Sequence, residues 1–367
     1  MTTMTFDAIS ECRAGPKWQA RWQRSWPAYQ AWFIGRGGDA GPDRDACHAA
    51  MARHMPELVR VYDRLVEVAG GSDRAARFLS TWCPPTYLGG CSLAALSDDT
   101  GVRLVRNYDL SPDLNEGLLL RSEWVRPVMG MVEFLWGLSD GINDAGLSVA
   151  LAYGGRSETA PGFGITTILR YILETCTSVS AAVAVLQKVP SHMAYNIVLA
   201  DPSGASASVE VLPGGGARVM PRSVATNHQQ SAGQPARSDF TRTYQRHAHL
   251  SELKSRAVNL HESFLQAPLR QDRYHEGFGT LFTAEYDPQA RRMRLLWPDE
   301  AWPQSLDAFE EGTRVIDLER GSTSAPAGVR LEMPDWGNAA NVDWAAVGRD
   351  YAAGQGRSMQ YYLAKCA

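Results

Sequence analysis

The sequence lacks several features that would assign the protein to a particular class. No run of about 18 consecutive apolar residues occurs in the 367-residue chain, which argues against a membrane-spanning helix. Only six residues are cysteine, too few for a fold held together by disulfides. Lysine and arginine (36 residues) do not outnumber aspartate and glutamate (40 residues), so there is no basic excess for nucleic acid. We therefore expect neither a membrane nor a nucleic acid as a partner.

The N-terminal segment lacks the pattern of a secretory signal peptide. It has no positively charged start followed by an apolar core. Without such a signal, we expect the protein to be cytoplasmic and its thiols to be reduced.

Motifs for metals and cofactors are also scarce. His247 and His249 lie two positions apart in a helical pattern, where they point in different directions, and no cysteine or acid completes a set of ligands. The GFG segment at residues 162–164 lacks the Gly-Lys-Ser/Thr ending of a phosphate loop. We expect no metal ion and no cofactor.

The first ninety residues instead have helical periodicity. Aromatic side chains recur every three or four positions from Trp18 to Tyr29, which predicts amphipathic helices that Pro27 interrupts or kinks. Two further helical patterns cover residues 44–69 and 72–81.

From residue 91 onward the pattern becomes that of β-strands. Residues 91–110 are typical of two strands joined by a tight turn at DDTG, and both are apolar at nearly every position. Further strands are predicted at residues 146–153, 195–204, 206–212, 223–228, 278–287 and 293–297, and helices at 165–176, 179–188 and 238–254. A strand-rich middle flanked by helices favours two packed sheets with helices outside them.

The predicted hairpin brings a cysteine close to charged residues. If the turn is centred within DDTG, Cys91 faces Tyr108 and lies beside Arg106 and Asp109. Charged residues on a buried strand need partners, and an arginine near a thiol favours the thiolate. Cys91 is therefore a candidate reactive thiol. The alternative is a small core residue that follows a flexible glycine pair.

The ordered set of motifs resembles the N-terminal nucleophile (Ntn) hydrolases, and among them the acyl-coenzyme A:6-aminopenicillanic acid acyltransferase (isopenicillin N acyltransferase) family. Choloylglycine hydrolases and penicillin V acylases are more distantly similar. The matching features span roughly residues 44–300 and are Gly90-Cys91, Arg106-Asn107-Tyr108-Asp109, GINDAGLSVALAY (141–153), YNIVLADPSG (195–204), ATNH (225–228) and FTAEYDPQARRMRLLW (282–297).

The resemblance implies an α+β fold, a four-layer αββα sandwich with a helical N-terminal prosegment. In such proteins the thiol of the future first residue, here Cys91, attacks the preceding carbonyl, here that of Gly90. The inactive precursor is thereby cut into residues 1–90, the prosegment, and residues 91–367, the catalytic chain. The two pieces remain associated as one composite domain.

The resemblance also implies the chemistry of the mature enzyme. The sulfur of Cys91 is the nucleophile and its new α-amino group, with a pKa near about 7.7–8.0, is the base. A thioester forms from the acyl group of a linear amide and passes to water or to an amine. The expected partners are thus a small-molecule amide or acyl donor and, for transfer, an amine acceptor. Coenzyme A thioesters are candidate donors, although no adenine-nucleotide motif demands them.

Further site residues are carried over from the family's motifs. Arg106 and Asp109 match residues that hold the nucleophile and its amine. Asn227 and Tyr153 match the groups that stabilise the oxyanion. Arg242, in SDFTR, matches a further basic residue of the site.

The acyl specificity is less well defined by the sequence. Cys-Ser-Leu follows Gly90 here, whereas penicillin acyltransferases have Cys-Thr-Thr, and Asn227 is not followed by the proline usual in choloylglycine hydrolases. Candidates for lining an apolar acyl pocket are Trp124, Phe134 and Trp136, with core packing as an equal alternative. The remaining cysteines are expected to be packing or surface thiols: Cys12, Cys47, Cys83, Cys176 and Cys366.

One function of a different class remains open. The chain could stay uncleaved and act as a non-catalytic binding or assembly protein on an Ntn scaffold. The joint presence of Cys91, Arg106, Asp109 and Asn227 argues against this alternative.

Overall fold

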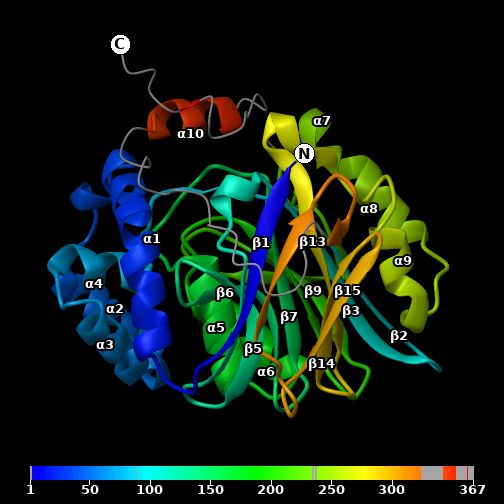
Figure 1. Ribbon diagram of the computed structural model, residues 1–367, viewed down its shortest axis with the longest axis horizontal. Coiled ribbons are helices and arrows are strands. Elements are labelled where there is room, and N and C mark those ends of the chain that lie inside the picture. The colour runs from blue at the N-terminus through cyan, green and yellow to red at the C-terminus, as the bar shows by residue number, and fades with distance from the viewer. Residues whose placement is uncertain are drawn as a thin grey trace.

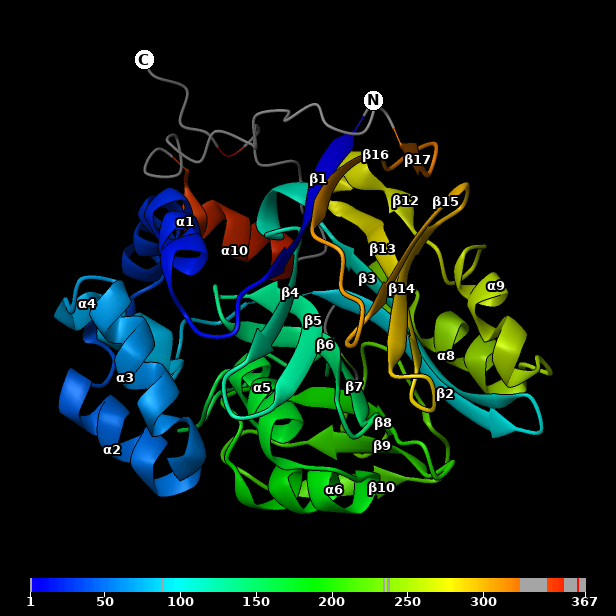
Figure 2. The ribbon, with the colours of Figure 1, turned by 60° about the horizontal axis from the view of Figure 1, so that its bottom comes forward.

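The computed structural model describes residues 2–87, 89–233, 235, 238–323, 342–352 and 362. Two β-sheets lie face to face, and helices cover the outer face of each (Figures 1 and 2). This arrangement confirms the predicted α+β, four-layer αββα architecture.

The larger sheet has ten strands in the order β10-β9-β8-β7-β6-β5-β4-β1-β16-β17. Their bounds are β1 (Thr3–Ser10), β4 (Leu118–Glu123), β5 (Pro127–Glu133), β6 (Gly137–Asn143), β7 (Ser148–Tyr153), β8 (Tyr195–Ala200), β9 (Ser206–Val211), β10 (Ala217–Met220), β16 (Gly312–Asp317) and β17 (Ser322–Thr323). The N-terminal strand β1 pairs in parallel with β4 and antiparallel with β16.

The smaller sheet has the order β11-β2-β3-β13-β14-β15, and β12 pairs with β13 at its side. Their bounds are β2 (Gly90–Asp98), β3 (Gly101–Leu110), β11 (Val224–Ala225), β12 (Asp272–Arg273), β13 (Phe278–Asp287), β14 (Arg292–Trp297) and β15 (Glu300–Ser305). The β2–β3 register places Cys91 opposite Tyr108, which confirms the predicted hairpin.

Three apolar layers hold the sandwich together. Side chains such as Phe6, Leu93 and Phe282 fill the space between the two sheets. Helices α5 (Ile165–Thr175) and α6 (Val179–Lys188) pack on the outer face of the larger sheet. The outer face of the smaller sheet is covered by α8 (Thr243–Glu252) and α9 (Leu260–Phe264) (Figure 2), and α7 (Ser238–Thr241) contacts α8.

Residues 16–80 form a helical region beside the sandwich (Figure 1). Its helices are α1 (Pro16–Gly35), α2 (Arg44–His54), α3 (Val59–Val68) and α4 (Asp73–Ser80). The hydroxyl of Ser72 accepts from the backbone N–H of Ala75 and begins α4. A later helix, α10 (Trp344–Ala352), packs against α1.

The prediction that the first ninety residues are helical is wrong for residues 3–10. Residues 3–10 alternate between buried and more exposed side chains, with Met4, Phe6 and Ala8 buried, and form β1 in the larger sheet. Helix α1 also continues through Pro27. Within the described part of the chain, no helix combines the length and apolar character needed to cross a membrane.

Candidate functional site

Cys91 is the second residue of β2, and its side chain lies between the two sheets. Only 1% of the residue is exposed. The fully buried guanidinium of Arg106 donates from Nη2 to the Cys91 sulfur at 3.4 Å. Because an arginine favours a negative charge on the atom it contacts, this contact can stabilise a thiolate.

Arg106 is itself held by the facing sheet. Its Nη1 donates to the Ser139 hydroxyl at 2.9 Å and forms an ion pair with Asp140, and both residues belong to β6. Its guanidinium also lies over the Tyr108 ring, 4.0 Å from the ring centroid. The positive charge at the thiol is therefore compensated and fixed in position.

Asp109 lies on the opposite side of the smaller sheet from the Cys91 sulfur. Its Oδ1 accepts from the Thr280 hydroxyl at 2.7 Å, and its Oδ2 lies 3.6 Å from Nη1 of Arg246. Burial raises the pKa of the Asp109 carboxyl, while Arg246 and the Thr280 hydroxyl oppose this shift.

Asn227 contacts the backbone on both sides of the Gly90–Cys91 peptide bond. Its Oδ1 accepts from the Cys91 N–H at 3.1 Å, and its Nδ2 lies 3.5 Å from the Gly89 carbonyl oxygen. The same Nδ2 donates to the Tyr153 carbonyl at 3.2 Å. Tyr153 thus takes part in the site through its backbone, and its buried ring packs near Tyr195.

The arginine that the structure brings to this site is Arg246 and not Arg242. Arg242 is exposed at the start of α8, with a φ of 50°. Arg246, one helical turn later, is fully buried and donates to the Cys91 carbonyl, to the Ser92 hydroxyl at 2.9 Å and to Asn227 Oδ1 at 2.7 Å. Arg242 and Arg246 are four positions apart, a spacing that places two residues on the same face of a helix, so the sequence contained a signal for Arg246.

The three aromatic candidates for an acyl pocket separate in the structure. Trp136 is fully buried and donates to the Leu79 carbonyl, and Trp124 packs beside it with a ring-centroid distance of 6.2 Å. Both belong to the core between the larger sheet and its outer helices, not to the layer that contains Cys91. Phe134 instead lines a cavity.

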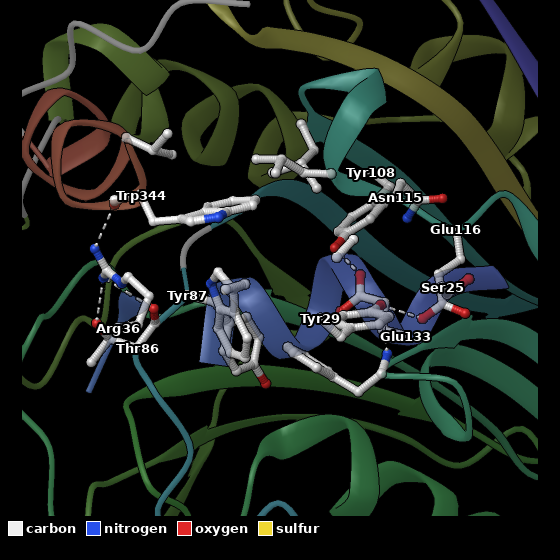
Figure 3. Close-up of a pocket in the computed structure, with 16 residues that line it drawn as sticks. Ser25, Tyr29, Arg36, Thr86, Tyr87, Tyr108, Asn115, Glu116, Glu133 and Trp344 are labelled. Carbon is white, nitrogen blue, oxygen red and sulfur yellow. Dashed lines mark hydrogen bonds between the residues drawn. The ribbon is translucent and has the colours of Figure 1, made fainter. Parts of the chain in front are cut away.

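This cavity has a volume of about 150 Å³, comparable to a protein cavity that holds benzene. Its walls come from α1, α10, β3, the end of β5 and the segment before Gly90 (Figure 3). Tyr108, the residue opposite Cys91, contributes to the wall. The lining residues are Ser25, Ala28, Tyr29, Trp32, Arg36, Thr86, Tyr87, Tyr108, Leu110, Leu114, Asn115, Glu116, Glu133, Phe134, Trp344 and Val347.

Burial dominates the electrostatics of the site. It raises the pKa of the Cys91 thiol to about 11 although Arg106 opposes the shift. Burial also raises the pKa of Glu133, on the cavity wall, to about 8, again against Arg106. The thiol of the intact chain is therefore protonated near neutral pH.

The other cysteines lie away from this constellation. Cys12 is exposed, Cys83 is half-buried, Cys47 and Cys176 are buried, and Cys366 lies outside the described residues. Among the residues that the structure describes, no three histidine, cysteine or acidic side chains gather as ligands of one metal ion would.

Comparisons with known proteins identify related sequences and folds. Residues 96–302 match the family model "Acyl-coenzyme A:6-aminopenicillanic acid acyl-transferase", a match that begins in β2 just after Cys91. No curated protein sequence matches the chain significantly.

Solved structures with similar folds have low sequence identity to this chain. A conjugated bile acid hydrolase from Clostridium perfringens is 15% identical, with a TM-score of 0.42, covering 61% of this chain and 96% of the other. Penicillin V acylase from Agrobacterium tumefaciens is 15% identical, with a TM-score of 0.39, covering 66% and 99%. The Caenorhabditis elegans ortholog of N-acylethanolamine-hydrolyzing acid amidase is 17% identical, with a TM-score of 0.39, covering 62% and 100%.

Proposed function

This chain belongs to the acyl-coenzyme A:6-aminopenicillanic acid acyl-transferase family of Ntn hydrolases, and we propose that it cleaves linear amides or transfers their acyl groups by way of a thioester on Cys91. One observation carries the proposal. Directly after a glycine, a buried cysteine has Arg106 at its sulfur and Asn227 at its backbone nitrogen. The substrate is a small-molecule amide or acyl donor, with an amine as acceptor in the transfer reaction. The cytoplasmic location stays a prediction from the sequence.

We propose that the same thiol first cuts its own chain. The Cys91 sulfur attacks the carbonyl carbon of Gly90, and the bond from this carbon to the Cys91 nitrogen breaks. The nitrogen takes up the proton that the thiol loses and becomes an α-amine, while residues 1–90 remain attached to the sulfur as a thioester. Water then hydrolyses this thioester, which releases the carboxyl group of Gly90 and the free thiol.

The surroundings of the Gly90–Cys91 bond support this step. A Cβ added to Gly90 would lie 2.3 Å from the Phe278 ring, so only glycine fits at this position. Asn227 accepts from the amide nitrogen that becomes the new amine, and Arg246 donates to the Cys91 carbonyl. Both ends of Cys91 are thus held in the intact chain that undergoes the cut.

Residues 1–90 remain with the catalytic chain after the cut, because β1 is built into the larger sheet. This strand lies between β4 and β16, and both neighbours come from the part of the chain that follows Cys91. Losing β1 would expose the backbone of two strands and the buried ring of Phe6. We therefore propose one composite domain made of residues 1–90 and 91–367.

In the mature enzyme the α-amine of Cys91 takes the proton from the thiol. The thiolate, stabilised by Arg106, attacks the substrate carbonyl, and the negative charge moves to the carbonyl oxygen. The Asn227 side-chain N–H is the candidate donor to this oxyanion, since the Tyr153 carbonyl orients it. The amine leaves with the transferred proton, and water or a second amine releases the acyl group from the thioester.

The raised thiol pKa is consistent with this order of events. In the intact chain, burial keeps the Cys91 thiol protonated. The cut creates an α-amine next to this thiol, and once the amine has taken the thiol proton its positive charge stabilises the thiolate. The cut thereby activates the nucleophile.

Denaturing electrophoresis and intact-mass measurement of the purified protein test the proposal. We expect the 40.2 kDa chain to appear as fragments of about 10 kDa and about 30 kDa in proportion to the two segments. Cys91→Ala remains whole, whereas the control Cys83→Ala, a half-buried cysteine close in sequence, is cut like the wild type. A wild-type chain that stays whole for days and forms no thioester would favour the non-catalytic binding protein.

A further inference from the structure

The cavity lined by Phe134 lies on the acyl side of the Gly90–Cys91 bond. In the proposed cut, residues before Cys91 are the acyl group that is attached to its sulfur. Two of them, Thr86 and Tyr87, line the cavity, and a Cβ added to Gly89 would lie 3.8 Å from the Tyr108 ring. A substrate's acyl group bonds to the same sulfur and leaves it along the same path. The cavity is therefore the pocket for the acyl group, an assignment that rests on the proposed function.

Aromatic rings form most of the cavity wall. Phe134 lies at ring-centroid distances of 5.7 Å from Tyr29, 5.6 Å from Trp32 and 4.8 Å from Tyr87. Figure 3 shows Tyr29 and Tyr87 between the two ends of the cavity. Faces of such rings attract cations as well as apolar groups.

Two buried carboxyl groups lie at one end of this aromatic cavity. Glu133 is 7% exposed and accepts from the Tyr108 hydroxyl, and Glu116 is 8% exposed. Oε1 of Glu116 accepts from the Tyr29 hydroxyl and from the Leu135 N–H at 2.9 Å. Its buried Oε2 has no hydrogen-bond partner within the described part of the chain. The acidic end thus retains an acceptor that no described residue satisfies.

The charges around this end are arranged asymmetrically. Arg106 faces Glu133 from behind the Tyr108 ring, and Arg21 and Arg24 act on Glu116 from α1. Of the cavity-lining residues, Arg36 alone is a cation, and it lies at the other end (Figure 3). There its guanidinium donates to Thr86 and to the backbone of Trp344.

We propose that this cavity receives an acyl group that carries a positively charged amino group, bound between the carboxylates of Glu133 and Glu116 and the surrounding aromatic faces. A purely apolar acyl group would leave Oε2 of Glu116 without a hydrogen-bond donor and both carboxyl groups in contact with an apolar surface that excludes water. An ammonium group supplies three donors and a charge of the required sign. It would also draw the carboxyl groups toward their ionised forms, since an adjacent cation lowers a carboxyl pKa.

Matched amides of one chromogenic amine test this assignment. We compare 3-aminopropanoyl with butanoyl, in which a methyl group replaces the ammonium, and with phenylacetyl 4-nitroanilide. For the wild type, kcat/KM is expected to be at least tenfold higher for the 3-aminopropanoyl substrate than for butanoyl. Glu133→Gln brings this ratio close to one, whereas Glu67→Gln, which removes an exposed carboxylate in the prosegment, retains it.

Two outcomes separate the cation assignment from the thioester mechanism. If butanoyl or phenylacetyl amides react faster than the 3-aminopropanoyl amide, the cation assignment is wrong while the thioester mechanism stands. If no amide reacts and no acyl group appears on Cys91, the proposed function fails. If Glu133→Gln does not fold, inhibition of the wild-type enzyme tests the cation assignment instead. Tetramethylammonium should then inhibit at least tenfold more strongly than tert-butanol, with sodium chloride as the salt control, and equal inhibition overturns the assignment.

Discussion

Replacement of Arg246 tests how the outer face of the smaller sheet supports Cys91. Arg246→Ala leaves the fully buried Asp109 without its cation, because Thr280 is then its remaining hydrogen-bond partner among the residues described. Removing one member of a buried ion pair costs about 3–5 kcal/mol of folding stability. The same change removes the donor that fixes Oδ1 of Asn227.

The effect on processing follows from that second loss. Arg246 fixes Asn227, whose Oδ1 accepts from the Cys91 nitrogen that leaves in the cut. Misplacing a positioned group by about 1 Å can slow a reaction by about a hundredfold, so Arg246→Ala should slow the cut by about ten- to a hundredfold. Arg246→Lys keeps a cation near Asp109 but lacks the planar set of donors. We therefore expect a clear loss in the rate of processing and a smaller loss in the free energy of unfolding than for Arg246→Ala.

Urea unfolding and time-resolved electrophoresis measure the two effects separately. Unfolding is measured in the Cys91→Ala background, where every chain remains whole. Arg242→Ala is the matched control: its exposed side chain predicts a change in unfolding free energy within about 0.5 kcal/mol and an unchanged rate of processing. The reasoning is refuted if Arg242→Ala impairs processing and Arg246→Ala leaves it at the wild-type rate.

Three further changes probe the cavity, the cut site and the core. Burial raises the pKa of Glu133 to about 8 from a usual value of 4.5. The stability that protonated Glu133 contributes is therefore fully present below pH 4.5 and is lost as the pH rises toward 8. Urea unfolding from pH 5 to pH 8 should therefore show a smaller decline for Glu133→Gln than for the wild type, and equal declines would contradict this origin. Gly90→Ala should remain whole on denaturing gels, since the new Cβ would meet the Phe278 ring, and normal cutting would show that this contact is not limiting. Trp136→Ala should cost about 3–5 kcal/mol in unfolding free energy while leaving acyl preference unchanged, and Phe134→Ala should change the preference; the reverse pattern in kcat/KM would place the pocket on the other side of the larger sheet.

The sequence was most informative where contacts are local. The β2–β3 hairpin is joined by a tight turn, so its register depends on a few neighbouring residues, and Cys91 lies opposite Tyr108 as predicted. The helix that begins after Ser72 was likewise predictable from its cap.

Contacts between distant segments were not predictable from spacing. Asp140 pairs with Arg106 across the two sheets, and no local pattern links these residues. Strands β4, β5 and β6 were not predicted: they contain buried polar residues such as Ser139, so their alternation is obscured. Arg242 was predicted from its match to the family, and Arg246 was missed because the break between α7 and α8, which sets the orientation of α8, depends on packing.

The proposed mechanism requires Cys91 to be an N-terminal residue whose α-amine and sulfur both act in the reaction. Amine-specific labelling of the purified, undigested protein, followed by proteolysis and tandem mass spectrometry, tests it directly. The account predicts a labelled peptide that begins Cys91-Ser92-Leu93, and the same peptide carrying the acyl mass on its sulfur after incubation with an amide substrate. A preparation that turns over the substrate while all recovered peptides still span the Gly90–Cys91 bond would contradict the account.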